Sequence, residues 1–205
     1  MKIPLLLAVF TAGLLAVVQG QEKPPAPAAP DVQRAYFAGG CFWCMQYAFD
    51  KVPGVSKTVV GYTGGKVAAP EYEEVSTGST GHAEAIEVQY DPAKVNFAQL
   101  LDVFWKNIDP TQENRQFADR GTQYRTAVFY RDDAEKQAAE ASKAALEKTG
   151  KYNGKTIVTE ITKVGSFYPA EEYHQEYYRK NPDRFQRYEV GSGRAGYIKK
   201  MWGAE

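Results

Sequence analysis

The sequence predicts an α+β fold, a two-layer α/β sandwich on a mixed, ferredoxin-like sheet with a βαββαβ core. Of the 205 residues, 43% are hydrophobic and 24% are charged, which is a normal balance for a globular domain. Strand-like and helix-like segments alternate in the order β-α-β-β-α-β-α-β-α, which favours this architecture. The two cysteines exclude a disulfide-dense small scaffold. A flavodoxin-like or thioredoxin-like arrangement is the alternative.

The charge balance limits the classes of partner. The chain has 25 lysines and arginines against 25 aspartates and glutamates, so its formal net charge is zero. Without a strong basic field, we expect no nucleic-acid partner. The cysteine count also excludes a zinc site built on four cysteines. We expect a monomer.

The N-terminal residues are typical of an export signal. Lys2 precedes an apolar run from Ile3 to Val18, and small or short residues lie just before Gln21. This pattern predicts a signal peptide at 1–20, hence a periplasmic or secreted protein. An uncleaved membrane anchor is the alternative, although the run is shorter than the roughly 20 residues of a membrane span. A proline- and alanine-rich linker at 21–31 then leads to a catalytic domain at 32–205.

The first half of the domain alternates strands with one helix. Apolar residues at positions 41, 44, 45, 48 and 49 have helical spacing, and Pro53-Gly54 ends that helix. Residues 83–90 alternate as in a strand, with Glu84 on the same face as Ile86. The predicted elements are a strand at Arg34–Ala38, a helix at Cys41–Lys51, a strand at Val55–Tyr62, a long loop to Gly81 and a strand at Ala83–Tyr90.

The second half begins with two capped helices. Asn96 can cap a helix that runs to Lys106, and Asp132 or Asp133 can cap one that ends before Gly150. The remaining predicted elements are a loop at Asp109–Arg125, strands at Thr126–Tyr130 and Thr156–Val164, and a final helix opened by Pro169 and closed by Asn181-Pro182. The tail after Gly191 keeps apolar residues that can wrap back onto the domain.

The most reactive segment is Gly-Gly-Cys-Phe-Trp-Cys at 39–44. Cys41 begins a predicted helix, where free N–H groups and partial positive charge favour a thiolate. Cys44 lies three residues on, with a Cα about 5 Å away, so a disulfide is possible. The pair is therefore predicted to cycle between dithiol and disulfide. The alternatives are two buried cysteines acting as small hydrophobes, or a metal site with His82 and His174.

Two further clusters carry polar groups. Glu84 points toward an apolar face, so its pKa is expected to be raised and it can act as a proton donor. The alternative places Glu84 at the strand edge, in water or paired with a base. His82, on a glycine-rich turn, is expected to hydrogen-bond the loop. Asp119 and Tyr124 belong to a loop that could serve turn formation alone.

Four segments together resemble one family. GGCFWC, YxxVxxGxTGHAE, DxGTQYR and FYPAEEYHQEY, in this order, resemble the A-type peptide-methionine (S)-S-oxide reductases from about Gln33 to Tyr188. The resemblance implies a ferredoxin-like α/β fold and reduction of the S epimer of methionine sulfoxide, free or in proteins. The roles it implies are a nucleophile at Cys41, an apolar wall for the substrate methyl group at Phe42 and Trp43, groups that hold the sulfoxide oxygen at Tyr72, Glu84 and Tyr124, a supporting acid at Asp119, and structural support at His174 and Tyr177.

The mechanism that follows from the resemblance needs no bound metal or organic cofactor. Cys41 attacks the sulfoxide sulfur while Glu84 protonates its oxygen, which leaves a sulfenic acid. Many members have glycine at the position of Cys44 and resolving cysteines in the tail, whereas this tail has none. Cys44 is then the resolving residue, and a thioredoxin-like dithiol outside the cytoplasm reduces the disulfide. A general disulfide oxidoreductase and a non-enzymatic metal-binding module are the competing hypotheses.

Overall fold

A six-stranded sheet organises the fold. The computed structural model describes residues 32–203, so the expected signal peptide (1–20) and linker (21–31) lie outside the described residues. The strands of the sheet are β1 (Gln33–Gly39), β2 (Val55–Thr63), β3 (Ala83–Tyr90), β6 (Thr126–Tyr130), β7 (Glu160–Lys163) and β8 (Tyr168–Pro169). A separate two-stranded ribbon pairs β4 (Arg115–Gln116) with β5 (Asp119–Arg120).

The sheet has the predicted ferredoxin-like core. Its strand order is β7-β6-β1-β3-β2-β8. Within the core, β1 pairs antiparallel with both β3 and β6, and β2 pairs antiparallel with β3. Phe37 in the central strand lies between Ile86 and Val128 in register. Only the β6–β7 pair, among the described strands, is parallel, which makes the sheet mixed as expected.

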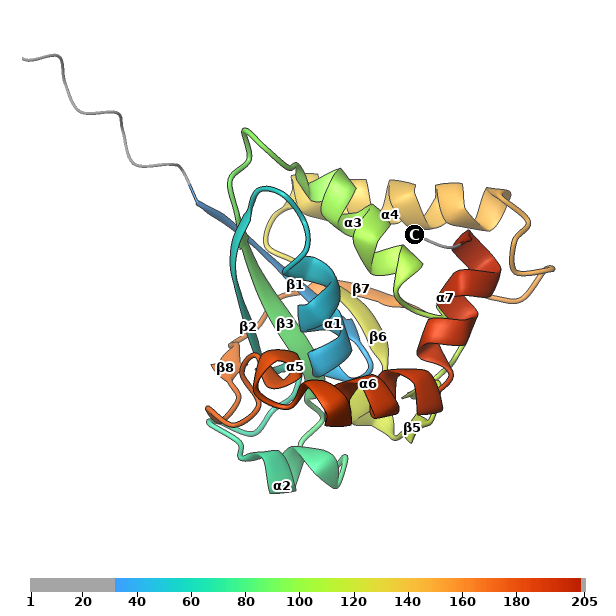
Figure 1. Ribbon diagram of the computed structural model, residues 1–205. Helices are drawn as coiled ribbons and strands as arrows, with labels where there is room; N and C mark the ends of the chain where they lie inside the picture. The colour runs from blue at the N-terminus through green and yellow to red at the C-terminus, as the bar shows by residue number, and fades with distance from the viewer. Residues whose placement is uncertain (1–31, 204–205) are drawn as a thin grey trace, which may run out of the picture.

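The helices lie around this sheet (Figure 1). They are α1 (Phe42–Phe49), α2 (Tyr72–Ser76), α3 (Phe97–Lys106), the 3₁₀ turn η1 (Thr122–Tyr124), α4 (Asp133–Lys148), α5 (Tyr177–Lys180), α6 (Pro182–Gly191) and α7 (Arg194–Trp202). The expected caps of α3 and α4 are confirmed. Asn96 accepts a hydrogen bond from the Gln99 amide at 2.9 Å, and Asp132 accepts one from the Glu135 amide at 2.9 Å.

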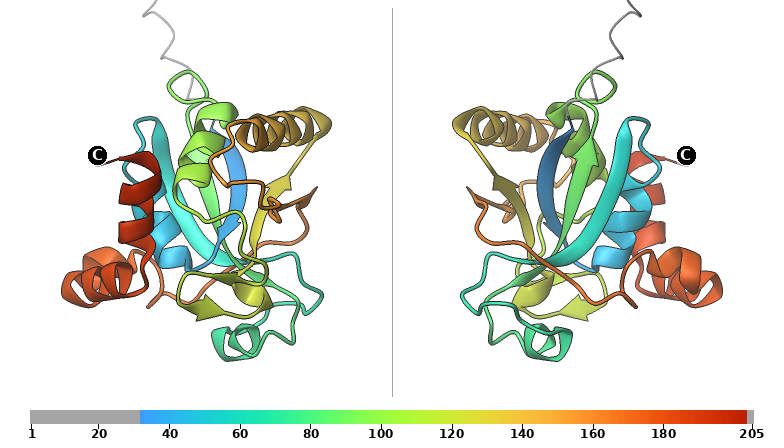
Figure 2. Two further views of the ribbon diagram at one scale, coloured as in Figure 1. Left: turned by 90° about the vertical axis from the view of Figure 1, so that its right-hand side faces the viewer. Right: turned by 90° about the vertical axis from the view of Figure 1, so that its left-hand side faces the viewer.

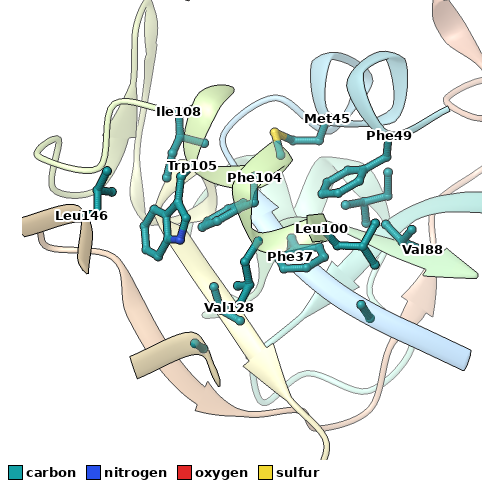
Figure 3. Packing of buried hydrophobic residues seen from close by; sticks show 14 of the residues in the cluster. Phe37, Met45, Phe49, Val88, Leu100, Phe104, Trp105, Ile108, Val128 and Leu146 are labelled. Carbon is teal, nitrogen blue, oxygen red and sulfur yellow. The ribbon is translucent and has the colours of Figure 1, made fainter. Parts of the chain in front are cut away.

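The main hydrophobic core lies between the sheet and three helices. Side chains from α1, α3 and α4 pack onto one face of β1, β3 and β6, as Figure 3 shows. Phe37 stacks on Phe49 of α1 at 5.1 Å and on Phe104 of α3 at 5.3 Å between ring centroids. Since aromatic burial contributes heavily to the core, these contacts fix α1 and therefore the cysteine pair at its N-terminus.

The opposite face of the sheet is covered by chain rather than by helices. Tyr36, Ala38, Ala85 and Phe129 form a second buried cluster there, and Val164 and Phe167 pack against it. The segment that carries Phe167 joins β7 to β8 and passes across this face (Figure 2). Both faces of β3 are therefore buried, and side chains pack against the strand on each side.

The C-terminal region differs from the prediction. The helix expected from Pro169 to Asn181 is wrong, because Pro169 pairs in β8 with Gly61 and only the short α5 follows the intervening turns. Pro182 opens α6 instead of closing a helix, since proline suits the first helical position. The strand expected at Thr156–Val164 is shortened to β7. No helix of the described residues is long and apolar enough to span a bilayer.

Candidate functional site

Cys41 lies at the N-cap of α1, directly after the double-glycine turn. Gly40 has a φ of +75°, and a Cβ at that position would lie 2.4 Å from Cβ of Gln116. The turn therefore requires glycine for both its conformation and its space. The Cys44 amide donates a hydrogen bond to the Cys41 carbonyl at 3.2 Å, which places the second cysteine one turn above the first.

Both thiols are buried, with Cys41 5% and Cys44 3% exposed. Burial raises the pKa of the Cys41 thiol, and its hydrogen bond to Cys44 acts in the same direction. The same hydrogen bond lowers the pKa of the Cys44 thiol. The expectation of a lowered Cys41 pKa is therefore wrong, because burial and the second thiol outweigh the partial charge of the helix N-terminus. These directions favour the protonated form of Cys41 and the thiolate form of Cys44.

Glu84 faces the cysteine turn from β3 and is 3% exposed. Its Oε2 accepts a hydrogen bond from the Phe42 amide at 3.0 Å. Burial raises the pKa of the Glu84 carboxyl well above its ordinary value, and the charge of a Cys41 thiolate adds to the effect. The direction agrees with the sequence-based expectation, and the alternative of a solvated carboxylate at the strand edge is wrong. The raised pKa favours the neutral carboxylic acid form of Glu84, the form from which a proton can be donated.

Two tyrosines approach the same space from different elements. Tyr72 begins α2, and Tyr124 ends η1. Burial raises the pKa of Tyr72 to about 12 and raises that of Tyr124 further. Both hydroxyls therefore keep their protons at neutral pH and can donate hydrogen bonds. The Tyr72 amide donates to Oε1 of Glu171 at 2.8 Å, which anchors the start of α2 on the C-terminal region.

Asp119 is held by a residue that the sequence did not predict. The hydroxyl of Tyr188 in α6 donates a hydrogen bond to Oδ2 of Asp119. Burial raises the pKa of the Asp119 carboxyl, while the hydrogen bond from Tyr188 and the charge of Arg194 act in the opposite direction. The tail thus closes the site from the side of α6, which lies beside the N-terminal end of α1 in Figure 1.

Trp43 forms one wall of the site and is itself fixed from behind. Its ring stacks on Tyr177 at 3.8 Å with an interplanar angle of 8°, and its Nε1 donates to Nδ1 of His174 at 3.2 Å. Because Nδ1 accepts this bond, His174 carries its proton on Nε2. Burial lowers the pKa of His174, which keeps the ring neutral. His174 and Tyr177 therefore contact the wall, and neither lines the pocket.

These groups enclose one pocket of about 200 Å³. It is lined by Cys41, Phe42, Trp43, Tyr72, Glu84, Asp119, Tyr124 and Tyr188. All the predicted site residues except Cys44 line it, and Tyr188 is the additional one. Cys44 lies in a cluster with Cys41, Tyr177 and Phe185. Two larger hollows, of about 670 and 700 Å³, lie elsewhere and contact neither cysteine.

Comparison with known proteins identifies the family. Residues 33–205 match the family described as peptide methionine sulfoxide reductase. The chain belongs to the A-type peptide methionine sulfoxide reductases. It is 52% identical over 171 residues to the peptide methionine sulfoxide reductase MsrA of Bacillus subtilis, covering 83% of this chain and 96% of that protein. The MsrA of Listeria monocytogenes EGD-e is 50% identical over 171 residues, with the same coverage of 83% and 96%.

Solved structures agree with this assignment. The reduced form of Mxr1 from Saccharomyces cerevisiae is 34% identical, with a TM-score of 0.69 over 77% of this chain and 88% of that chain. The methionine sulfoxide reductase A of Corynebacterium diphtheriae is 37% identical, with a TM-score of 0.69 over 76% of this chain and 77% of that chain. Both cover the fold that carries the pocket.

The histidines of this A-type reductase are engaged in hydrogen bonds. His82 Nδ1 accepts from the Gly65 amide at 3.1 Å, so Nε2 carries the proton and donates to the Val67 carbonyl at 2.7 Å. His82 therefore holds the glycine-rich loop, as expected from the sequence. Within residues 32–203, no group of three or more histidine, cysteine or acidic side chains is arranged to hold a metal ion.

Proposed function

We propose that this chain reduces the S epimer of methionine sulfoxide, free or in proteins, to methionine. The observation that carries the proposal is the 200 Å³ pocket in which the Cys41 thiol and the buried Glu84 acid face the same space. A sulfoxide needs a nucleophile at sulfur and a proton donor at oxygen. The aromatic rings of Phe42 and Trp43 supply an apolar surface for the methyl group next to the nucleophile.

In the first half-reaction, the Cys41 sulfur attacks the sulfoxide sulfur. Glu84 donates a proton to the sulfoxide oxygen, which Tyr72 and Tyr124 hold by hydrogen bonds. The carboxyl is restored by the proton that the Cys41 thiol gives up. The oxygen ends on Cys41 as a sulfenic acid, and methionine leaves, so that sulfur in the substrate gains the two electrons that Cys41 loses.

In the second half-reaction, Cys44 attacks the Cys41 sulfenic acid. The new S–S bond replaces the S–O bond, and the hydroxyl leaves as water with the Cys44 proton. An external thioredoxin-like dithiol then reduces the disulfide by thiol–disulfide exchange. Support comes from a structure of yeast Mxr1 in complex with Trx2, which is 25% identical with a TM-score of 0.50 and covers 74% of this chain and 87% of that chain.

The proposal includes an exported enzyme, periplasmic or secreted. It rests on the pattern of residues 1–20, in which Lys2 precedes an apolar run and small residues. The reductant would then be a thioredoxin-like protein outside the cytoplasm. Fractionation of cells that express the full chain tests this part, and active enzyme found in the cytosolic fraction alone would remove it.

The activity is tested with separate S and R epimers of a methionine sulfoxide substrate and dithiothreitol. The wild type, Cys41→Ser, Cys44→Ser and Glu84→Gln proteins are compared. We expect turnover of the S epimer alone, no methionine from Cys41→Ser, and one methionine per enzyme from Cys44→Ser in a single turnover. Reduction of neither epimer by the wild type would contradict the proposal.

The alternative function is a general thiol–disulfide oxidoreductase that uses the CxxC pair. The buried pair at a helix N-terminus is the feature that this class shares. Insulin reduction separates the two. An oxidoreductase of that class would reduce insulin and would be indifferent to Glu84→Gln, whereas the proposed enzyme depends on Glu84.

A further inference from the structure

Arg194 is a buried cation beneath the cysteine turn. It begins α7 in the tail that carries no cysteine, and it is only 2% exposed. Its Nη2 donates to the Gly39 carbonyl at 2.8 Å, and its Nη1 donates to the Asn107 carbonyl. The guanidinium also lies over the Phe117 ring, with its carbon 4.8 Å from the ring centroid.

The charge of Arg194 is not neutralised by a neighbouring acid. The guanidinium contacts two backbone carbonyls, the Phe117 ring and the sulfur of Met45, and within residues 32–203 no carboxylate lies within ion-pair distance of it. A buried, unpaired charge is costly to a fold. Backbone carbonyls offset only part of that cost. Because no ion pair neutralises it, the positive charge of Arg194 can lower the pKa of nearby acidic groups.

The guanidinium contacts residues on both sides of the cysteine pair in the sequence. Gly39 lies two residues before Cys41, and Met45, whose sulfur is 3.8 Å from Nη1, directly follows Cys44. The charge of Arg194 lowers the pKa of the Cys44 thiol, second among the lowering contributions after the hydrogen bond from Cys41. Burial of both partners keeps solvent from screening this interaction.

We propose that Arg194 is a positioning residue for the second half-reaction, in which its buried charge favours the thiolate of Cys44 and its hydrogen bond fixes the turn that presents Cys41. The inference rests on the proposed function. The Cys44 thiolate attacks the sulfur of the Cys41 sulfenic acid, the S–S bond forms, the S–O bond breaks, and the hydroxide takes up a proton and leaves as water. A lower pKa raises the fraction of Cys44 that is ready to attack at neutral pH.

Other charged groups near Cys44 oppose Arg194. The carboxylates of Glu189 in α6 and Asp119 in β5 both raise the pKa of the Cys44 thiol, as does its burial. From α1 itself, Cys41 supplies the hydrogen bond that lowers it. Once Cys41 is a sulfenic acid, its S–H donor has been replaced by an S–OH group. The positive charge of Arg194 is unaffected by this change and continues to favour the Cys44 thiolate.

The decisive measurement is the titration of Cys44 by its ultraviolet thiolate absorbance. It is made in the Cys41→Ser background, with the Cys41→Ser/Cys44→Ser protein subtracted so that tyrosine ionisation cancels. We expect Arg194→Met to raise the titration midpoint by about one pH unit and Arg194→Lys to recover at least half of that shift. The matched control is Arg187→Met, which removes an exposed guanidinium from α6 and is expected to leave the midpoint unchanged.

A second measurement times the two half-reactions in the enzyme with both cysteines. Methionine release and the loss of free thiols are followed in a single turnover without reductant. Arg194→Met is expected to slow disulfide formation about tenfold more than it slows methionine release at neutral pH. Circular dichroism and the unfolding midpoint show that the variants remain folded.

The outcomes separate this inference from the proposed function. An unchanged Cys44 midpoint in folded Arg194→Met, or an equal shift in Arg187→Met, overturns the role of Arg194. A wild type that releases no methionine contradicts the proposed function, while the titration still reports whether Arg194 acts on Cys44. If Arg194→Met does not fold, Arg194→Gln replaces it, because glutamine keeps hydrogen-bond donors but removes the charge. The same rise of the midpoint is expected, and an unchanged midpoint overturns the role of Arg194.

Discussion

The two sides of the cysteine pair differ in electrostatic character. On the pocket side, Cys41 faces Glu84, Tyr72 and Tyr124, and burial raises the pKa of each of these three groups. The two tyrosine hydroxyls keep their protons at neutral pH, and burial favours the neutral form of the Glu84 carboxyl. On the side of α7, the positive charge of the buried Arg194 guanidinium lowers the pKa of the Cys44 thiol.

The difference matches the chemistry of the two half-reactions in the proposed mechanism. The proposed first step places a proton on the sulfoxide oxygen, which neutral donors favour. The proposed second step uses a sulfur anion, which a nearby positive charge favours. One turn of α1 separates the two environments, because Cys41 and Cys44 are three residues apart on it. The comparison teaches that a single helix end can place two thiols in different electrostatic environments.

The largest expected effect comes from removing the proton on the pocket side. Glu84→Gln keeps the shape and a hydrogen-bond donor but cannot transfer a proton, so methionine release in a single turnover should slow by about 10²–10³-fold. Glu87→Gln is the matched control, since Glu87 is a buried acid of the same strand that accepts from Tyr36 on the opposite face. If both variants slowed methionine release to a similar extent, the effect would not be specific to the acid beside Cys41, and the distinction between the Cys41 and Cys44 sides would fail.

The paired tyrosines should each contribute less. Tyr72→Phe or Tyr124→Phe removes one of two hydroxyl donors at the sulfoxide oxygen, and we expect each to slow methionine release about tenfold. Both effects should appear in the step before the disulfide forms. Tyr47→Phe, on α1 but outside the pocket lining, serves as the control. If a tyrosine variant slowed only disulfide formation, that tyrosine would act on Cys44 and not on the sulfoxide oxygen.

Tyr188 should have a smaller effect that reaches the pocket through Asp119. Tyr188→Phe removes the hydrogen bond to Asp119 but keeps the ring that meets Trp43 edge to face at 6.0 Å. We expect a loss of about 1 kcal/mol in the free energy of unfolding, and a several-fold fall in activity. Denaturant titration and steady-state kinetics measure the two quantities. An activity loss as large as that of Glu84→Gln would make Tyr188 a proton donor in its own right.

The smallest expected effect is a pH dependence of stability that comes from Glu84. Because the folded pKa of Glu84 is raised, the native state binds more protons than the unfolded state. Its contribution to stability is full below about pH 4.5, the ordinary value, and is lost as pH rises toward the folded value. Glu84→Gln does not titrate. The unfolding midpoint of the variant, relative to the wild type, should therefore rise between about pH 4 and pH 8. A constant difference across that range would show that Glu84 is not held as an acid.

The core of the fold could be predicted because local patterns and tertiary packing agree there. The period-two pattern of residues 83–90 marks β3 with its observed bounds, and the cap at Asn96 marks the start of α3. The region after Pro169 could not be predicted, because pairing with β2 overrides the preference of proline for a helix start. The register of a two-residue edge strand is set by the sheet and leaves no local pattern.

The site divides in the same way. Cys41, Glu84 and Tyr124 lie in segments whose order along the chain marks them as functional. Tyr188 lies outside any such segment, and only its spacing from the buried Phe185, one helical turn before it, could have pointed to the inner face of α6. The upward shift of the Cys41 pKa could not be predicted for a different reason. Burial of a thiol is a tertiary property that a helix N-terminus in the sequence cannot reveal.

The packing of Met45 has a consequence for how long the enzyme lasts among oxidants. Its sulfur lies directly beneath the cysteine turn, so close that a Cβ on Gly39 would stand 2.4 Å from it, and the side chain is 1% exposed. Peroxides reach a methionine sulfur through solvent, and the oxygen they add needs room. Met45 offers neither access nor room. The methionine packed against the reactive turn is thus shielded from the oxidants whose damage this family repairs.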